Sequence, residues 1–329
     1  MRSIKKSLSE VGRGVVSVGK KLYASKKAYA FLLPLFFFLL LFSYYPAFSG
    51  IYHSFFDWKD IGESSFIGFA NYVELFTDTE VFWPSCLTLL KIMIPKLIIN
   101  IVVPLVIAEM IFNLNSNKAK SFYRLWVLIP MVAPGVVITL VWDYIYDPNF
   151  GLVSALWTMF GGETVDWLND TRTVIPAIIF MGFPWIGGTS VLIYTSGLNA
   201  TSAEARESAR IDGAGTWQII FLIDLPQIFG QVKFFLINGL IAGIQDYSVQ
   251  FLLTEGGPGY DTMVPGYYMY EKAFFSGEFG YAAASVVLRF FAARKECDFA
   301  LSSPLFSKAY RRSFHPIGYC RFRRMRLYP

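Results

Sequence analysis

The sequence predicts an all-α protein, a polytopic membrane helix bundle of about six transmembrane helices. Apolar residues make up 54 % of the 329 residues and charged residues 16 %, whereas soluble globular domains have about 45–50 % and about 25 %. The mean hydropathy is +0.45. The segments from Ala28 to Phe56 and from Thr173 to Ala203 contain no Asp, Glu, Lys or Arg. Because about 20 apolar residues cross the bilayer core, at least two segments can span it, and a soluble globular enzyme is excluded.

Five apolar segments are candidate spans. They run over residues 28–49, 87–114, 125–144, 174–198 and 228–253. The first is longer than the roughly 7–15 apolar residues of a secretory signal, so we expect an uncleaved membrane helix. Near the start of the second, the amines of Lys91 and Lys96 are expected to reach the membrane surface.

A sixth span should begin near Phe279, but the apolar pattern fails there. Only ten residues separate Glu278 from Arg289, fewer than a span needs. We therefore predict a transmembrane domain over residues 28–288 with a degraded sixth helix, and an atypical basic tail over residues 289–329. Two explanations remain open: a reading-frame change near residue 288, or a span completed by Arg289 reaching the membrane surface.

The first 27 residues are basic and have a helical apolar stripe. The stripe consists of Ile4, Leu8, Val11, Val15, Val18 and Leu22, at alternating steps of four and three. This pattern predicts an amphipathic helix lying on anionic lipid. The alternative is an unstructured basic tail.

The distribution of Lys and Arg predicts the orientation. Thirteen basic residues lie in segments 1–27, 113–124 and 199–227, and only three lie in the alternate loops. Since positive loops remain cytoplasmic, we expect a cytoplasmic N-terminus and a cytoplasmic 199–227 loop.

Neither a metal site nor a nucleotide site is predicted, and no cofactor is expected. The three cysteines, Cys86, Cys297 and Cys320, form no CxxC and lie far in sequence from both histidines. Residues 14–21 approach the phosphate-binding pattern GxxxxGK[ST], but Lys21 stands where Ser or Thr is needed. No nucleic-acid partner is expected either.

The loop that ends at Pro226 has its own helical signals. Thr201 and Glu204 fit a capping box that starts a helix. Good helix formers follow, and Gly213 is a typical C-terminal cap. A second helical stretch begins at Thr216, so we expect helix, tight turn, helix. Such a projecting pair suits docking into a groove of a partner. The alternative is a connector that caps the bundle.

This loop resembles the EAA loop of binding-protein-dependent ABC importer permeases. In that family, EAA is followed by three residues, a Gly, nine residues and I-x-L-P. Ser208 replaces the second motif position's Ala, and Gly230 stands where a further Pro is common. The matching residues are Glu207, Ser208, Ala209, Asp212, Gly213, Ala214, Ile223, Leu225 and Pro226.

Three further stretches are similar to the carbohydrate-uptake branch, the MalF/UgpA/LacF-like permeases. They are residues 66–72, 147–152 and 253–259, the last similar to the family's L-T-x-G-G-P-G. The resemblance implies a MetI-like permease of a bacterial inner membrane that performs no chemistry itself. It also implies a second, MalG-like permease subunit, two cytoplasmic ATPase subunits and an extracytoplasmic sugar-binding protein. Glu207, Asp212 and Gly213 would couple ATP hydrolysis to the passage of a carbohydrate.

The fifth span contains a polar cluster that we predict to line the substrate path. It consists of Asn238, Gln245, Asp246, Tyr247 and Gln250. Intramembrane ionisable residues are costly and usually functional, although polar contacts between helices are the alternative. The site would lie where helices break, as Pro184 and Gly187-Gly188 suggest for the fourth span.

Two other functions can be weighed against this one. An ion-coupled secondary transporter could use Asp246 with Lys233 as its coupling pair. A membrane enzyme could use Asp143 with Asp246, but the sequence lacks a paired carboxylate or His motif with suitable spacing.

Overall fold

The computed structural model describes residues 26–59 and 64–302, and it is almost wholly helical. Within these residues the one sheet is a two-stranded antiparallel hairpin, formed by β1 (Phe56–Asp57) and β2 (Ser65–Phe66). The predicted all-α bundle is confirmed. The stripe predicted between Ile4 and Leu22 lies outside the described residues, as does the tail beyond residue 302.

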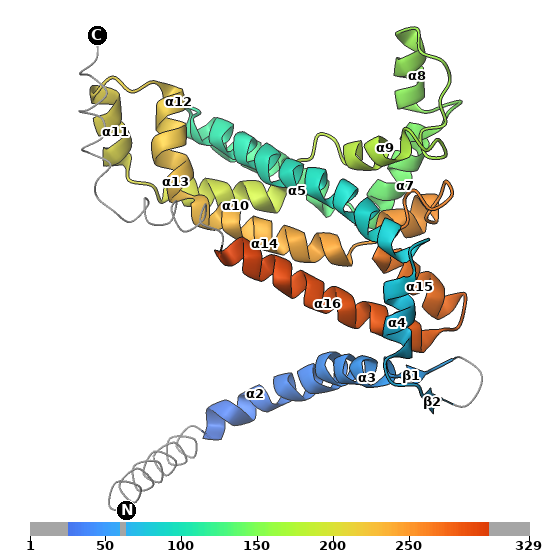
Figure 1. Ribbon diagram of the computed structural model, residues 1–329. Helices are drawn as coiled ribbons and strands as arrows, with labels where there is room; N and C mark the ends of the chain where they lie inside the picture. Colours follow the sequence, from blue (N-terminus) through green and yellow to red (C-terminus); the bar gives the residue numbers. More distant parts are fainter. Residues whose placement is uncertain (1–25, 60–63, 303–329) are drawn as a thin grey trace, which may run out of the picture.

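The first span is a continuous apolar rod. It consists of α2 (Lys26–Leu39), a π-helical turn η1 (Leu40–Tyr44) and α3 (Tyr45–His53). None of its apolar window from Ala30 to His53 is buried inside the chain, and α2 extends away from the other helices (Figure 1). The apolar surface of α2 is therefore uncovered in the described part of the chain, whereas α3 contacts α16.

The helix α5 (Phe82–Phe112) is the centre of the fold. After the short α4 (Ala70–Thr77), it contributes a buried residue to each of the three apolar clusters, for example Phe82, Ile92 and Ala108. It contacts α9, α10, α14 and α15. The predicted second span is thus confirmed and begins five residues earlier.

The third predicted span is not one continuous helix. It divides into α6 (Asn117–Trp126), a 3-10 turn η2 (Ile129–Val132) and α7 (Gly135–Tyr146), with a bend of 85° at the break. Pro130 and Pro134 flank the break, and proline both removes an amide donor and restricts the residue before it. The span predicted over residues 125–144 is therefore a bent pair of helices and not one straight helix.

The fourth span breaks where the sequence predicts. After α8 (Leu152–Met159), helix α9 (Val174–Phe180) ends at Phe180 and α10 (Gly188–Asn199) begins at Gly188. Gly182 and Trp185 between them have φ values of 94° and 53°, which no helix accommodates. The Trp185 ring packs edge-on against two phenylalanines of this break.

The last spans follow a loop of short helices. These are α11 (Ala203–Ile211), α12 (Thr216–Ile219), the π-helical turn η3 (Ile220–Asp224) and α13 (Leu225–Gln227). Helix α14 (Phe229–Gln245) follows, then the π-helical turn η4 (Gln250–Thr254), α15 (Pro265–Phe274) and α16 (Phe279–Ser302).

Helix α16 passes residue 288 without a break. It runs on through Arg289, whose Nη2 donates a hydrogen bond to the carbonyl oxygen of Ile244 on α14. The predicted boundary between residues 28–288 and 289–329 therefore falls inside a helix, and Arg289 bonds into the bundle.

By length and composition, two described helices can cross a membrane alone. They are Ala30–His53 and Phe82–Phe112, and two bent pairs raise the number to four when each pair is one span. The remaining two predicted spans correspond to the broken α9–α10 segment and to α16, in which Phe279–Ala292 is a shorter apolar helix.

Candidate functional site

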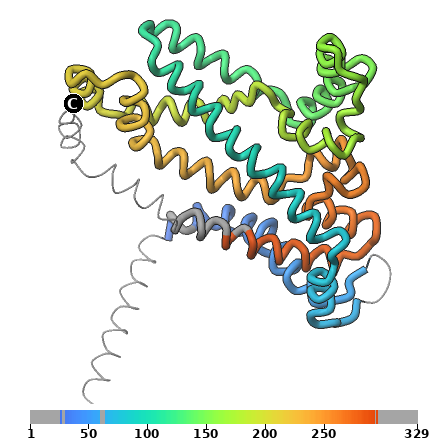
Figure 2. Tube along the Cα trace, turned by 45° about the horizontal axis from the view of Figure 1, so that its top comes forward, coloured from blue at the N-terminus to red at the C-terminus, as the bar shows by residue number. Residues whose placement is uncertain are grey.

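Residues 199–227, which we call the knob, form the predicted helix, turn and helix. The knob lies at the opposite end of α5 from the β1–β2 hairpin (Figure 1), and Figure 2 shows the same separation from a second direction. The short helices α11 and α12 lie next to each other around the turn. The knob is thus an outlying element attached to one end of the bundle.

The predicted capping box of Thr201 and Glu204 is wrong. The Oγ1 of Thr201 donates a hydrogen bond of 2.6 Å to the carbonyl oxygen of Leu198, the last part of α10. Instead, the Oγ of Ser202 accepts the amide hydrogen of Ala205 at 3.2 Å and caps α11. The hydroxyl of Thr201 closes the preceding helix, so α11 begins one residue later than predicted.

The turn after α11 depends on Gly213. Its φ is 83°, and its amide donates to the carbonyl oxygen of Arg210 at 3.0 Å. The amide of Ala214 donates to the carbonyl oxygen of Ala209 at 2.9 Å. Together these bonds form a Schellman motif, for which glycine is the usual residue. The predicted role of Gly213 as the helix C-terminal cap is confirmed.

The motif residues divide between the surface and the interior of the knob. The side chains of Glu207 and Asp212 are exposed, as is Gly213, whereas Ala209 is buried. The partly buried members of the motif are Ser208, Ala214, Ile223, Leu225 and Pro226.

Apolar side chains join the acidic groups on the surface of the knob. Ile211 is 81 % exposed and Trp217 is 72 % exposed, and the Trp217 ring stacks on Phe221. Large apolar side chains exposed beside charges are typical of a docking surface. The sequence reasoning missed these residues, although Trp217 and Phe221 are four apart on a short helix and therefore share a face.

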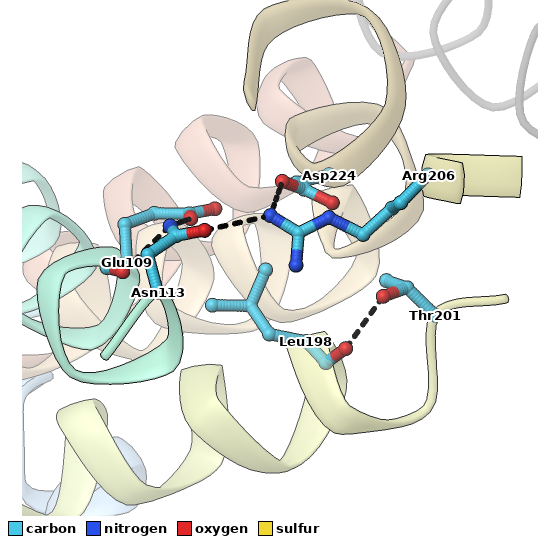
Figure 3. A network of polar contacts seen from close by, with 6 residues as sticks. All are labelled: Glu109, Asn113, Leu198, Thr201, Arg206 and Asp224. Atoms are coloured by element: carbon cyan, nitrogen blue, oxygen red, sulfur yellow. Dashed lines mark hydrogen bonds and ion pairs between the residues drawn. The ribbon is translucent and has the colours of Figure 1, made fainter. Parts of the chain in front are cut away.

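A polar network links α11 to the rest of the knob and to the end of α5 (Figure 3). The Nη2 of Arg206 lies 2.9 Å from Asp224 Oδ2 and donates a second hydrogen bond of 2.9 Å to Asn113 Oδ1. The Nδ2 of Asn113 donates to Glu109 Oε2 at 3.2 Å. The sequence reasoning missed this network, because its members come from three separate segments of the chain.

A cleft of about 460 Å³ lies between α5, α10 and α14. Three of the predicted path residues line it, namely Asn238, Asp246 and Gln250, whereas Gln245 and Tyr247 do not. Tyr247 instead packs toward the ring of Tyr270, with 5.9 Å between centroids.

Asp246 lies at a helix break within the fifth predicted span. It follows the last residue of α14 and accepts a hydrogen bond of 3.0 Å from the amide of Ser248, and the candidate span continues to Thr254. Lys96 and Asn100 of α5 also line the cleft. The expectation that Lys96 reaches a membrane surface is therefore wrong, because it lies in the middle of α5 and lines the cleft.

The alternative pair of Lys233 and Asp246 is not brought together. The two residues are 13 apart in sequence, which corresponds to about 20 Å along a helix. Asp143 does not line the cleft that Asp246 lines. Among residues 26–59 and 64–302, no group of three or more His, Cys, Asp or Glu side chains could hold a metal ion.

Comparisons with known proteins agree on one family. Residues 100–293 match the model of the binding-protein-dependent transport system inner membrane component. The chain is 32 % identical over 259 residues to the probable ABC transporter permease protein YurN of Bacillus subtilis, covering 78 % of this chain and 88 % of that protein. It is 31 % identical over 257 residues to the multiple sugar-binding transport system permease protein MsmF of Streptococcus mutans, covering 76 % and 86 %.

The fold is similar to that of a solved transporter chain. That chain comes from a bacterial alginate ABC transporter in complex with an alginate pentasaccharide-bound periplasmic protein. The TM-score is 0.75 and the sequence identity 23 %, over 85 % of this chain and 94 % of that one.

Proposed function

The chain belongs to the binding-protein-dependent transport system inner membrane components, and from this membership we propose that it is the permease subunit of a bacterial ABC importer for a sugar or oligosaccharide. ATP hydrolysis in separate subunits drives the transport. The observation that carries the proposal is the knob, an exposed acidic and apolar element built on the Gly213 turn at one end of the bundle.

A carbohydrate substrate is supported by one sequence stretch and by the names of two similar proteins. The stretch from Leu253 to Gly259 is similar to the L-T-x-G-G-P-G of sugar permeases. The relative MsmF is named for multiple sugar-binding transport, and the similar solved structure is an alginate transporter.

The knob docks on an ATPase subunit in this proposal. Glu207 and Asp212 supply acidic groups for basic partners, and Ile211, Trp217 and Phe221 supply apolar contact area. Charge complementarity fixes the register of such an interface, and aromatic anchors contribute much of its binding energy.

Two substitutions in the knob test the docking. Glu207→Lys reverses an exposed charge, and Gly213→Asp places a side chain at φ 83°, a conformation that costs about 1–2 kcal/mol for other residues. We expect both variants to reach the membrane folded but to lose sugar uptake and co-purified ATPase subunits. Glu163→Lys is the matched control, because that carboxylate is exposed on the loop after α8, far from the knob. Unchanged uptake in both knob variants would exclude the docking role.

The complete transporter contains four kinds of component in this proposal. A second permease subunit, MalG-like, covers the exposed apolar surface of α2 and α3, none of which is buried in this chain between Ala30 and His53. Two ATPase subunits bind at the knob end, and an extracytoplasmic sugar-binding protein delivers the substrate at the opposite end.

The cleft forms part of the substrate path. Asn238, Asp246 and Gln250 offer hydrogen-bond donors and acceptors of the kind that sugar hydroxyls require, with Lys96 and Asn100 facing them from α5. Gln245 and Tyr247 flank the break at the end of α14.

Asp246→Asn tests this part of the proposal. The exchange keeps the size of the side chain and an acceptor for the Ser248 amide, but it removes the charge in the cleft. We expect weaker sugar uptake with normal ATPase assembly. Glu255→Asn is the control, since that carboxylate lies beyond η4 and does not line the cleft. Equal uptake in the wild type and Asp246→Asn would remove Asp246 from the path.

The orientation in the inner membrane is a further part of the proposal. The excess of Lys and Arg in segments 1–27, 113–124 and 199–227 supports a cytoplasmic N-terminus and knob. Labelling of single cysteines in the knob and in the β1–β2 hairpin by a membrane-impermeant reagent checks it. A knob labelled from outside intact cells would contradict both the orientation and the docking.

The ion-coupled alternative is disfavoured by the separation of Lys233 from Asp246. Uptake that requires ATP and ignores ion gradients is the expected result. For the atypical tail over residues 289–329, we keep the proposal of a reading-frame change near residue 288. Sequencing the end of the gene tests it directly.

A further inference from the structure

The ion pair that holds α11 to the rest of the knob is largely buried. Asp224 is fully buried, and the side chain of Arg206 is 14 % exposed. The guanidinium of Arg206 also lies 4.5 Å from the centre of the Phe112 ring. Burying two charges costs desolvation free energy that their attraction offsets only with good geometry and further hydrogen bonds. A surface loop that merely connects two helices does not require such a pair.

A single nitrogen of Arg206 makes both of its side-chain hydrogen bonds. The Nη2 of Arg206 serves both Asp224 Oδ2 and Asn113 Oδ1. The Nε of Arg206 and the Oδ1 of Asp224 are buried and have no hydrogen-bond partner in the described part of the chain. Arginine and carboxylate frequently form two parallel hydrogen bonds, whereas here the second arginine bond goes to α5. Arg206 thus connects the Asp224 turn of the knob with Asn113 at the end of α5.

The two connected segments lead to the two walls of the cleft. Asn113 follows the last residue of α5, and Asn100 lines the cleft 13 residues earlier on the same helix, about 20 Å along its axis. Asp224 is the last residue of η3, and α13 and then α14 follow it; Asn238 lines the cleft from α14. Arg206 therefore bonds α11 to the C-terminal end of α5 and to the turn of the knob that leads toward α14 (Figure 3).

Resting on the proposed function, we propose that Arg206 is a positioning residue that transmits movement of the knob to α5 and α14. Glu207 beside it is exposed and faces the partner, while Arg206 faces the bundle. Docking and transmission thus use adjacent residues on different sides of α11. A knob without Arg206 would still bind the ATPase subunit, but its displacement would no longer move both walls of the cleft together.

The experiment measures sugar transported per ATP hydrolysed in the reconstituted complete transporter. Arg206→Gln removes the charged connection. Asn113→Ala removes the bond from Arg206 to the end of α5, together with the bonds from Asn113 to Glu109, and leaves Arg206 paired with Asp224. Lys120→Gln is the matched control, because Lys120 is a cation 5.4 Å from the same Phe112 ring but belongs to α6.

We expect Arg206→Gln and Asn113→Ala to retain ATPase subunits at the wild-type ratio and to hydrolyse ATP. Their transport per ATP should fall at least about fivefold, the lower end of typical coupling effects. Lys120→Gln should transport as the wild type does. A purely structural role would lower the yield of folded protein and leave transport per ATP unchanged.

Two results would overturn the inference. In the first, Asn113→Ala and any folded Arg206→Gln protein transport as much sugar per ATP as the wild type does. The other is loss of the ATPase subunits from these variants, which would make Arg206 a docking residue. Failure of the proposed function is distinguishable, since the wild-type chain would then neither bind ATPase subunits nor take up sugar at the expense of ATP.

Discussion

Replacing Gly188 by alanine tests how closely the start of α10 packs against the end of α6. Gly188 is buried at the start of α10, directly after the break in the fourth span. A Cβ at this position would lie 2.5 Å from the carbonyl oxygen of Val127 and 3.3 Å from the Cα of Leu128. Ordinary contacts between carbon and a carbonyl oxygen are about 3.3–3.6 Å. The backbones must therefore separate by about 0.8 Å, and overpacking of this kind costs roughly 1–3 kcal/mol.

Gly230→Ala is the matched comparison for Gly188→Ala. Gly230 lies in α14, and a Cβ there would meet nothing within 4 Å. Alanine should stabilise a helix at such a position by about 0.5–1 kcal/mol. The two variants can be compared by thermal unfolding in detergent, followed by size-exclusion chromatography. Since 1 kcal/mol shifts Tm by about 2–4 °C in proteins of 150–250 residues, we expect Gly188→Ala to melt several degrees below Gly230→Ala. A Gly188→Ala protein as stable as Gly230→Ala would refute the close approach of α10 to the end of α6.

Two further predictions concern the knob and the loop before α5. Ser202→Ala should destabilise α11 by about 0.5–2 kcal/mol and speed hydrogen exchange at the Ala205 amide. If Thr201→Ala speeds exchange at that amide and Ser202→Ala does not, Thr201 is the cap and this assignment is wrong. The pKa of the Asp78 carboxyl is shifted below its ordinary value, because burial, which raises it, is outweighed by hydrogen bonds that the Val81 amide and the Tyr268 hydroxyl donate to it. An acid with a lowered pKa stabilises the fold above its unfolded pKa, about 3.9, and this stabilisation is lost as the pH falls through the folded pKa. The stability lost in Asp78→Asn should therefore be constant between about pH 5 and pH 8 and shrink below about pH 4; a loss that grows on acidification would contradict the assignment.

The sequence alone determined the features that depend on local chemistry. Long apolar runs without charge can only be buried in lipid or a core, so the helical membrane class followed from composition and spacing. Gly213 and the glycines and Pro184 of the fourth span predicted a turn and a break, because these residues set the backbone conformation at their own positions. The helix formers before Gly213 and the helical stretch after Thr216 predicted a projecting helix pair for the same reason.

The tertiary structure decided what depends on residues distant in sequence. Arg206 meets Asn113 across 93 residues, and no periodicity in either segment encodes that contact. Lys96 and Asp246 line one cleft only because α5 packs against α14. Thr201 lost the capping role to Ser202 because its hydroxyl bonds to the end of α10. In each case the side chain could have formed several different contacts, and the packing of whole helices determined which one forms.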